Sequence, residues 1–260
     1  MKKLIMVSLA SVLILGACGE KKDAGSTDTK KEAPEQVINL TSEAQISTMD
    51  PALAADTTAT LAMDQVYEGL YAVGKDNEFE LGVAKEEPTI SEDQTTYTFK
   101  LKEEAKWSDG TPVTAQDFVF GWQQIVDTTV GSPNADVMVG VVKNAKEIYE
   151  EGADPKTLGV KALDDHTLEV QLETISNKIS ILPYLKSLLT FSIFYPKKET
   201  FYEEQGKEFA TTSDNLIYNG PFVLKDWDSF SDDWVYEPNE EYWDRDAVKL
   251  DSATVQVIKT

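Results

Sequence analysis

The chain has 260 residues, of which 41% are hydrophobic and 10% aromatic, so it is long enough to fold around a substantial core. Its formal net charge of -22, from 24 basic and 46 acidic residues, excludes nucleic acid as a partner because phosphates would be repelled. The single cysteine excludes an intrachain disulfide, so packing must stabilise the fold.

The first 17 residues have the pattern of a secretory signal peptide. Two lysines precede an apolar run from Leu4 to Leu15, which is too short and wrongly flanked to span a bilayer. Two small residues follow, and then Cys18, at the position where a lipoprotein precursor is cut and its new first residue accepts a lipid. We expect lipid on Cys18; the alternative is a small buried cysteine. The protein would then lie on the outer face of the membrane.

Residues 18–34 are predicted to form a flexible tether. From Glu20 to Pro34 the chain is mainly Lys, Asp, Gly, Ser, Thr and Glu, which cannot bury enough apolar surface to offset conformational entropy. Two or more acyl chains give stable retention, so lipid and tether would connect the protein to the membrane. The acidic body itself would be repelled by anionic headgroups.

Alternating helix and strand periodicities predict a mixed α/β body after the tether. Asp56 and Thr57 are candidate caps of a helix that continues to Leu70. Thr114, with Asp117 three positions later, predicts a capping box at the start of a second helix. The supporting apolar residues are Met63, Val66, Tyr67 and Leu70 in the first helix, Phe118, Trp122, Ile125 and Val126 in the second, and Tyr97, Phe99 and Leu101 in a strand between them.

The second half of the body continues this alternation. Apolar spacing predicts a helix from Met138 to Tyr149, ended by Gly152 and Pro155. Two strands follow, 160–163 and 168–172, joined by a turn with two aspartates. The remaining predicted elements are a buried helix at 179–189, a helix that starts at Pro196 and runs towards Gly206, and strands at 222–224 and 255–258.

The residues argue against several classes of catalytic site. His166 is the only histidine and follows two aspartates in a turn, so we expect an exposed turn residue, not a metal ligand or general base. No Gly-x-Ser-x-Gly elbow, Walker lysine or Gly-x-Gly-x-x-Gly loop occurs. Adjacent carboxylates such as Glu86–Glu87 and Asp232–Asp233 lie in polar stretches, which favours solvated charge over a glycosidase pair. We therefore expect no catalytic residue, metal or cofactor.

The five tryptophans divide into two groups. Trp107 and Trp122 have apolar neighbours at periodic spacing, so core packing is favoured over stacking on a ligand. Trp227, Trp234 and Trp243 lie among aspartates, and a sugar-binding stripe stays open for them.

The tract from Ala105 to Trp122, AKWSDGTPVTAQDFVFGW, predicts a strand, a tight turn at Ser108–Thr111 and a helix whose entry Pro112 fixes. This tract resembles the signature of the bacterial extracellular solute-binding proteins of family 5, the oligopeptide-binding lipoproteins of ABC importers. Further segments are similar to the family's N-terminal half in the same order, so the resemblance covers nearly the whole mature chain. These segments are Met49–Pro51, Val66–Leu70, Thr96–Phe99, Leu158–Thr167, Asn219–Phe222 and Tyr242–Asp244.

The resemblance implies an α/β fold, namely a type II periplasmic-binding-protein lobe with an inserted α/β subdomain. Its core subdomain would comprise residues 35–67 and 197–260, and the insertion residues 68–196. Family members are longer, so the resemblance implies that a second lobe is missing from this chain. A chain without that lobe would bind peptide weakly, since half the cleft would be absent.

The resemblance also implies a cleft in which an extended peptide adds as a strand. Ala55, Asp56 and Thr57 correspond to the loop that supplies one edge of this cleft, with Thr57 the candidate for pairing with the peptide main chain. Asn134, after Ser132 and Pro133, takes a cleft-facing position where family members often carry an aromatic residue.

The implied function is capture of oligopeptides outside the cell and their delivery to an ABC permease and its ATPase subunits, without chemistry by this protein. Ligand binding would shift the equilibrium of the protein from an open to a closed conformation. Two alternatives stay open. One is a peptide-pheromone receptor that uses the same importer, and the other is a secreted glycoside-active enzyme built on the acidic residues.

Overall fold

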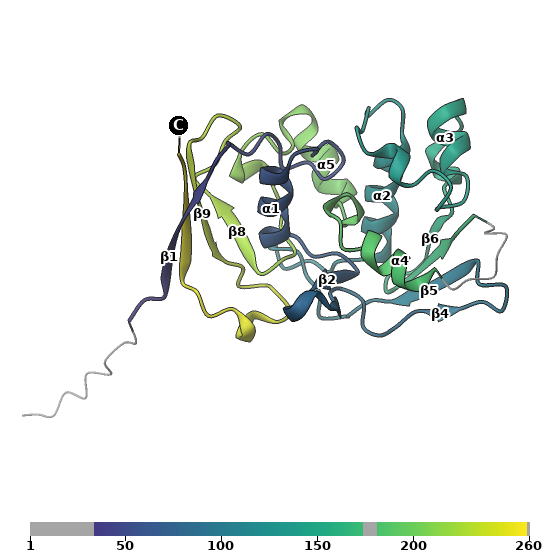
Figure 1. Cartoon of the computed structure of the whole chain (residues 1–260), viewed down its shortest axis with the longest axis horizontal. Helices are drawn as coiled ribbons and strands as arrows, with labels where there is room; N and C mark the ends of the chain where they lie inside the picture. The colour runs from purple at the N-terminus through teal and green to yellow at the C-terminus, as the bar shows by residue number, and fades with distance from the viewer. Residues whose placement is uncertain (1–33, 174–180, 259–260) are drawn as a thin grey trace, which may run out of the picture. The chain divides into compact units, whose positions relative to one another are not determined.

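Two four-stranded sheets are the framework of the computed structural model, which describes residues 34–173 and 181–258 (Figure 1). The first sheet has the order β1-β10-β9-β8; β1 and β10 are parallel, and the other neighbours are antiparallel. The second sheet, β4-β5-β7-β6, is antiparallel throughout. The strands are β1 (Val37–Ser42), β4 (Thr89–Ile90), β5 (Thr96–Lys100), β6 (Val160–Asp164), β7 (Thr167–Gln171), β8 (Phe222–Lys225), β9 (Asp233–Pro238) and β10 (Ser252–Val257).

A short β-ribbon and several helices complete the fold. The antiparallel pair β2 (Tyr71–Val73) and β3 (Phe79–Leu81) stands apart from both four-stranded sheets. The α-helices among the described residues are α1 (Thr57–Val66), α2 (Ala115–Val126), α3 (Ala145–Glu151), α4 (Leu182–Leu188) and α5 (Glu199–Gln205). Helix α1 contacts β8 of the first sheet, whereas α2 contacts β6 and β7 of the second.

The two sheets draw their strands from different parts of the chain. The first combines β1 with β8, β9 and β10, so that Val37 pairs with Ser252 in a parallel ladder. The second takes all its strands from the middle of the sequence. The hydrophobic core is nevertheless continuous, and the described residues from Glu35 onward form one compact unit. The subdomain boundaries expected at residues 67/68 and 196/197 stay a prediction.

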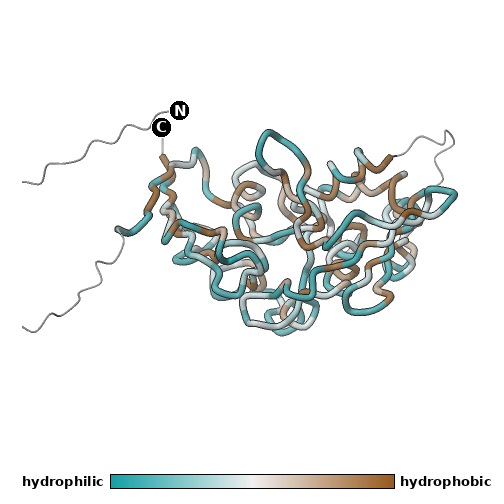
Figure 2. Tube along the Cα trace, turned by 90° about the horizontal axis from the view of Figure 1, so that it is seen from below, coloured by the Kyte–Doolittle hydropathy of each residue, from teal (hydrophilic) through white to brown (hydrophobic). Residues whose placement is uncertain are grey.

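The helices bury the faces that their sequence periodicity predicted. Helix α1 buries Met63 and Val66, and α2 buries Phe118 and Trp122. The indole N–H of Trp122 donates to the carbonyl of Phe194, 2.9 Å away, so the polar atom of this fully buried ring is satisfied. Hydrophobic and hydrophilic residues alternate along the chain instead of forming separate blocks (Figure 2), as expected for elements with one buried face.

The corner between Trp107 and α2 confirms the predicted turn and capping box. Gly110 adopts φ +82°, and its N–H donates to the carbonyl of Trp107 at 2.8 Å. Asp117 then accepts hydrogen bonds from the backbone N–H of Thr114 (2.8 Å) and the indole of Trp107 (3.1 Å). One buried carboxylate therefore caps the helix and fixes the tryptophan beside it.

The helix predicted from Met138 to Tyr149 is wrong in its first half. Helix α3 starts only at Ala145, and Asn144 before it has φ +66°. Val142 forms a bridge with Leu172, and the N–H of Lys143 donates to the carbonyl of Gln171. Pairing with the end of β7 therefore replaces helical hydrogen bonds. The predicted helix end is confirmed, because Gly152 caps α3 in the left-handed conformation.

Two other helix boundaries also differ from prediction. Helix α1 ends at Val66, not near Leu70, because the Val66 carbonyl accepts from the N–H of Gly220 on a distant segment. Helix α5 starts at Glu199, not Pro196, because Lys198 before it has extended dihedral angles (φ -75°, ψ 106°). Helix α4 lies within the range predicted for a buried helix, whose residues 179 and 180 lie outside the described residues.

The hairpin β6–β7 and the strands β8 and β10 confirm the corresponding predictions. His166 lies in the turn of the hairpin, as predicted, but it is half-buried instead of exposed. Its backbone explains this, because the His166 carbonyl accepts from Leu101 N–H and draws the turn against the end of β5.

Cys18 and the residues of the expected signal peptide lie outside the described residues. Among residues 34–173 and 181–258, we find no helix with the length and apolar character needed to cross a bilayer. The same residues contain no group of three or more His, Cys, Asp or Glu side chains placed to hold a metal ion.

Candidate functional site

Two adjoining pockets form a groove along one side of α1. The Asn134 pocket, of about 500 Å³, lies between the loop before α1 and the segment at Thr190–Ile193. The tyrosine pocket, of about 390 Å³, lies beyond the other end of α1 and has four tyrosines in its lining, namely Tyr67, Tyr71, Tyr195 and Tyr242. Asp64, Val73 and Thr190 line both pockets, so the two are continuous.

The structure brings Ala55 and Asn134 together, although 78 residues separate them in sequence. Both line the Asn134 pocket. The side-chain amide of Asn134 donates to the carbonyl of Ala54 at 2.7 Å, and this bond ties the segment around Asn134 to the loop before α1. The rest of the lining mixes polar residues such as Thr60 and Asp64 with exposed apolar side chains, since Val73 is 57% exposed and Phe191 48% exposed.

Ala55 presents an unpaired stretch of main chain at the rim of this pocket. Its side chain is exposed. Within the part of the chain that the structure describes, neither its backbone N–H nor its carbonyl makes a hydrogen bond. The neighbouring residue Asp56 has extended dihedral angles (φ -117°, ψ 157°). An extended ligand strand could therefore pair with the backbone at this point.

Asp56 and Thr57, the other two candidates in this loop, have different roles in the structure. Asp56 is the N-cap of α1: one carboxylate oxygen accepts from Ala59 N–H at 2.9 Å, and the other accepts from the hydroxyl of Ser47. Its side chain is thus committed within the protein. Thr57 is the exposed first residue of α1 and does not line the Asn134 pocket.

Asp64 lies where the two pockets meet, and the sequence analysis missed it. The hydroxyl of Tyr195 donates to one of its oxygens at 2.7 Å. Partial burial raises the pKa of Asp64, and this hydrogen bond opposes the rise. The available signal was helical spacing: Asp64 comes four residues after Thr60 and eight after Asp56, so it lies on the same side of the helix as these two residues.

Glu68, the second carboxylate of the tyrosine pocket, is 8% exposed and fully hydrogen-bonded. Its two oxygens accept from the hydroxyl of Tyr242 and the indole of Trp243, each at 2.6 Å. Burial raises the pKa of Glu68 despite these bonds and the nearby charge of Lys102. Lys102 itself lies 4.0 Å from the centre of the Trp243 ring, and burial lowers its pKa.

The tryptophans do not form an exposed stripe. Trp107 and Trp122 are buried, as predicted. Trp227 and Trp234 are also buried, and the half-buried Trp243 is held between Glu68 and Lys102. Buried rings cannot stack on a sugar, so the sugar-binding alternative loses the residues on which it depended.

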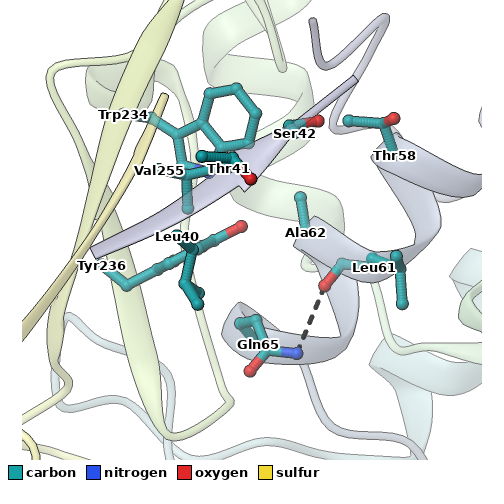
Figure 3. Close-up of a pocket in the computed structure, with 10 residues that line it drawn as sticks. All are labelled: Leu40, Thr41, Ser42, Thr58, Leu61, Ala62, Gln65, Trp234, Tyr236 and Val255. Atoms are coloured by element: carbon teal, nitrogen blue, oxygen red, sulfur yellow. Dashed lines mark hydrogen bonds between the residues drawn. The ribbon is translucent and has the colours of Figure 1, made fainter. Parts of the chain in front are cut away.

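A separate apolar groove lies on the opposite side of α1. It has a volume of about 270 Å³, and no charged side chain lines it. Figure 3 shows Leu40 of β1, Leu61 of α1, and Trp234 and Tyr236 of β9 around this groove. Gln65 lines both this groove and the tyrosine pocket, and its side-chain amide donates to the carbonyl of Leu61.

The fold and the groove on α1 define one lobe of a substrate-binding protein. Residues 78–260 match the model of the family described as bacterial extracellular solute-binding proteins, family 5 middle. The chain therefore belongs to this family, whose members are substrate-binding proteins, not enzymes.

Known relatives and solved structures agree on this assignment. The dipeptide-binding protein DppE of Bacillus subtilis is 35% identical over 87% of this chain and 40% of its own length. A structure of Listeria monocytogenes OppA bound to peptide is 42% identical, with a TM-score of 0.81 over 87% of this chain and 43% of that one. The pheromone receptor PrgZ has the same TM-score at 36% identity, over 87% of this chain and 44% of its own. The chain thus spans less than half the length of these relatives.

Proposed function

We propose that this chain is the lobe of a receptor that captures oligopeptides outside the cell and delivers them to an ABC permease and its ATPase subunits. The observation that carries the proposal is the unpaired backbone of Ala55 at the rim of the Asn134 pocket. It occurs in a family member whose fold matches a solved protein bound to peptide.

The geometry supports recognition of the peptide main chain. All peptides share backbone amides and carbonyls, so a receptor for varied sequences gains affinity by pairing with them as an added strand. Ala55 supplies a backbone donor and acceptor that no other described residue uses, while the bond from Asn134 to Ala54 holds the loop in place. The Asn134 pocket, at about 500 Å³, leaves space for varied side chains and water.

The proposal includes a membrane anchor on the outer face of the cell. Residues 1–17 would be the signal peptide, Cys18 would carry the lipid, and residues 18–34 would be the tether. Replacing Cys18 with serine is expected to release the protein into the medium. Partition of both forms between detergent and water tests this, and continued retention of the C18S protein would contradict lipid attachment.

A peptide-pheromone receptor that uses the same importer is the second candidate, and the similarity to PrgZ favours it over the glycoside-active enzyme. Uptake and signalling separate the two peptide-binding roles. If deletion of the gene abolishes growth on peptides as the nitrogen source, nutrient import is supported; loss of a response to one specific peptide supports a pheromone role. Hydrolysis of model glycosides, lost on replacing one carboxylate, would support the enzyme and contradict the proposal.

Peptide binding by the protein, at the full length made by the cell, tests the main-chain contact. Ala55→Pro removes the backbone N–H, and we expect the Kd for short peptides to rise about tenfold, as for loss of one well-placed hydrogen bond. Ala55→Ser keeps the N–H and is the matched control. Calorimetry with both variants measures the effect. An unchanged Kd in A55P would contradict pairing at Ala55, and failure of any peptide to bind the unmodified protein would contradict the proposed function.

A further inference from the structure

The Asn134 pocket contains apolar side chains that the fold leaves exposed. Val73, at the end of β2, is 57% exposed, and Phe191 is 48% exposed; both line the pocket. Phe79 of β3 lies opposite Val73 in the antiparallel ribbon and is 41% exposed. Opposite residues share one face of such a pair, so Phe79 extends the apolar surface beyond the pocket. Val73, Phe79 and Phe191 together are called the apolar wall below.

The backbone that carries Phe191 is fixed by the protein core. Its N–H donates to the carbonyl of Leu188, and its carbonyl accepts from the N–H of Phe194, each at 2.9 Å. The next three residues, Ser192–Phe194, are buried, and the carbonyl of Phe194 also accepts from the indole of Trp122. Phe191 is therefore an exposed ring on an anchored segment. A ligand that covers this ring does not have to order the backbone beneath it.

Most polar side chains of the pocket already have partners within the protein. The hydroxyls of Thr60 and Thr190 donate to main-chain carbonyls at 3.0 and 2.8 Å, and the amide of Asn134 donates to another at 2.7 Å. Asp64, the one charged residue among the described residues of the lining, accepts from the hydroxyl of Tyr195. The surface left without a partner is thus mainly apolar. An acidic ligand group would meet the carboxylate of Asp64 with no cation in the lining to balance it.

A peptide strand paired with Ala55 would bring a side chain to the apolar wall. Ala55 lines the same pocket, and the neighbouring residue Asp56 has extended dihedral angles. Side chains alternate between the two faces of a strand, so every second side chain of the ligand points to the same side. The pocket, at about 500 Å³, has the size of a small-molecule site and holds a complete aromatic or branched side chain.

We propose that the Asn134 pocket is a subsite for a large apolar side chain of a bound peptide, and that Phe191 and Val73 determine this preference. This inference rests on the proposed function and names the class of side chain that the groove selects. Contact with the apolar wall removes apolar surface of both partners from water. An aromatic ligand side chain also gains from an offset or edge contact with the ring of Phe191.

A peptide series measures the preference. Pentaalanine carries phenylalanine, leucine or aspartate at each position in turn, and calorimetry with the full-length protein gives each Kd. At one position we expect phenylalanine and leucine to bind about tenfold more tightly than alanine, as for a partly buried apolar side chain. Aspartate at that position should bind more weakly than alanine, because its charge has no partner in the pocket.

Three variants show whether the apolar wall is responsible. Phe191→Ala removes the ring, and Val73→Thr keeps the branched shape but replaces a methyl group with a hydroxyl. We expect the tenfold preference to fall to about threefold in F191A and about fivefold in V73T, with the Kd for pentaalanine unchanged. Tyr184→Ala is the matched control, because it removes a ring of α4 that is 55% exposed and lines neither pocket of the groove. It should keep the full preference.

The outcomes separate this inference from the proposed function. Equal binding of the alanine, leucine and phenylalanine peptides at every position, with measurable affinity, overturns the subsite and leaves peptide binding intact. A preference that stays complete in both F191A and V73T, or that is lost in Y184A, overturns the role of the apolar wall. If F191A no longer binds pentaalanine, the conservative variant V73T decides. If no peptide binds the unmodified protein, the proposed function and the subsite both fail.

Discussion

Two carboxylates of the tyrosine pocket, Glu68 and Asp64, are only four residues apart but differ in burial and in the number of their hydrogen bonds. Glu68 is buried and has both oxygens hydrogen-bonded, with Lys102 nearby. Asp64 is exposed, has one hydroxyl partner and forms no salt bridge within the described residues. The hydrogen bonds of Glu68 connect segments that are far apart in the sequence, whereas the carboxylate of Asp64 lines the groove. The buried carboxylate of Glu68 contributes to the fold through its hydrogen bonds, whereas the exposed carboxylate of Asp64 stays accessible to solvent.

The same contrast holds at the start of the groove. Asp50 and Lys197 form a buried salt bridge (2.9 Å) that ties the loop before α1 to the segment before α5. Ala55, five residues after Asp50, has a backbone with no partner among the described residues. The protein thus fixes its loop with internal polar contacts, while the backbone of Ala55 has no partner among the described residues. Substitutions at these residues test the difference between the fixed and the free groups.

Asp50→Asn should have the largest effect on stability. It leaves the ammonium group of Lys197 buried without a countercharge, and burial already lowers the pKa of Lys197. We expect a loss of about 3–5 kcal/mol in the free energy of unfolding, measured by denaturant titration. The double variant Asp50→Asn, Lys197→Met is the control, because it removes both charges and should recover much of the loss. Equal stability of wild type and D50N would show that the pair does not fix the loop.

Glu68→Gln should cost about 2 kcal/mol, because the new amide cannot accept from both Tyr242 and Trp243. The effect should depend on pH. Since burial raises the pKa of Glu68 in the folded state, its ionisation opposes folding, so the wild type loses stability relative to E68Q as the pH rises from about 4.5 through that raised pKa. Unfolding measured across this range checks the sign. A difference that grows with pH would contradict it.

Asp56→Ala should cost about 1 kcal/mol through loss of the helix N-cap. Thr57→Ala, at the exposed first position of α1, is the neighbouring control and should change stability little. Thermal unfolding of the two variants gives the comparison. If T57A lowers the melting temperature as much as D56A, the cap is not the source of the effect.

Asn134→Ala should have the smallest effect on stability, about 0.5–1 kcal/mol, because it removes one hydrogen bond to Ala54 at a half-buried site. Its larger consequence should be local. Amide hydrogen exchange is expected to speed up in the loop before α1, since the bond that holds this loop is gone. Unchanged exchange at residues 54–56 would show that Asn134 does not restrain the loop.

Local patterns in the sequence were reliable where the chain satisfies its own backbone. The turn at Gly110, the cap at Thr114 and Asp117, and the β6–β7 hairpin need only neighbouring residues, and the structure has them as predicted. Prediction failed where a distant segment competes. The pairing of Val142 with Leu172 replaces the first half of the helix predicted from Met138 to Tyr149. The hydrogen bond from Gly220 N–H to the carbonyl of Val66 ends α1 before the predicted position.

The sequence by itself determined the family, the α/β class and the acidic charge, because motif order, periodicity and composition do not depend on contacts between distant segments. It also pointed to Ala55 and Asn134 through resemblance, although their role as binding residues stays a prediction. Only the tertiary structure placed those two residues in one pocket and showed that Asp56 is committed to its helix. It alone separated Asp64 from Glu68, since the partners that satisfy Glu68 lie more than 170 positions away. Whether a charge is satisfied depends on such long-range contacts, and no local pattern reports them.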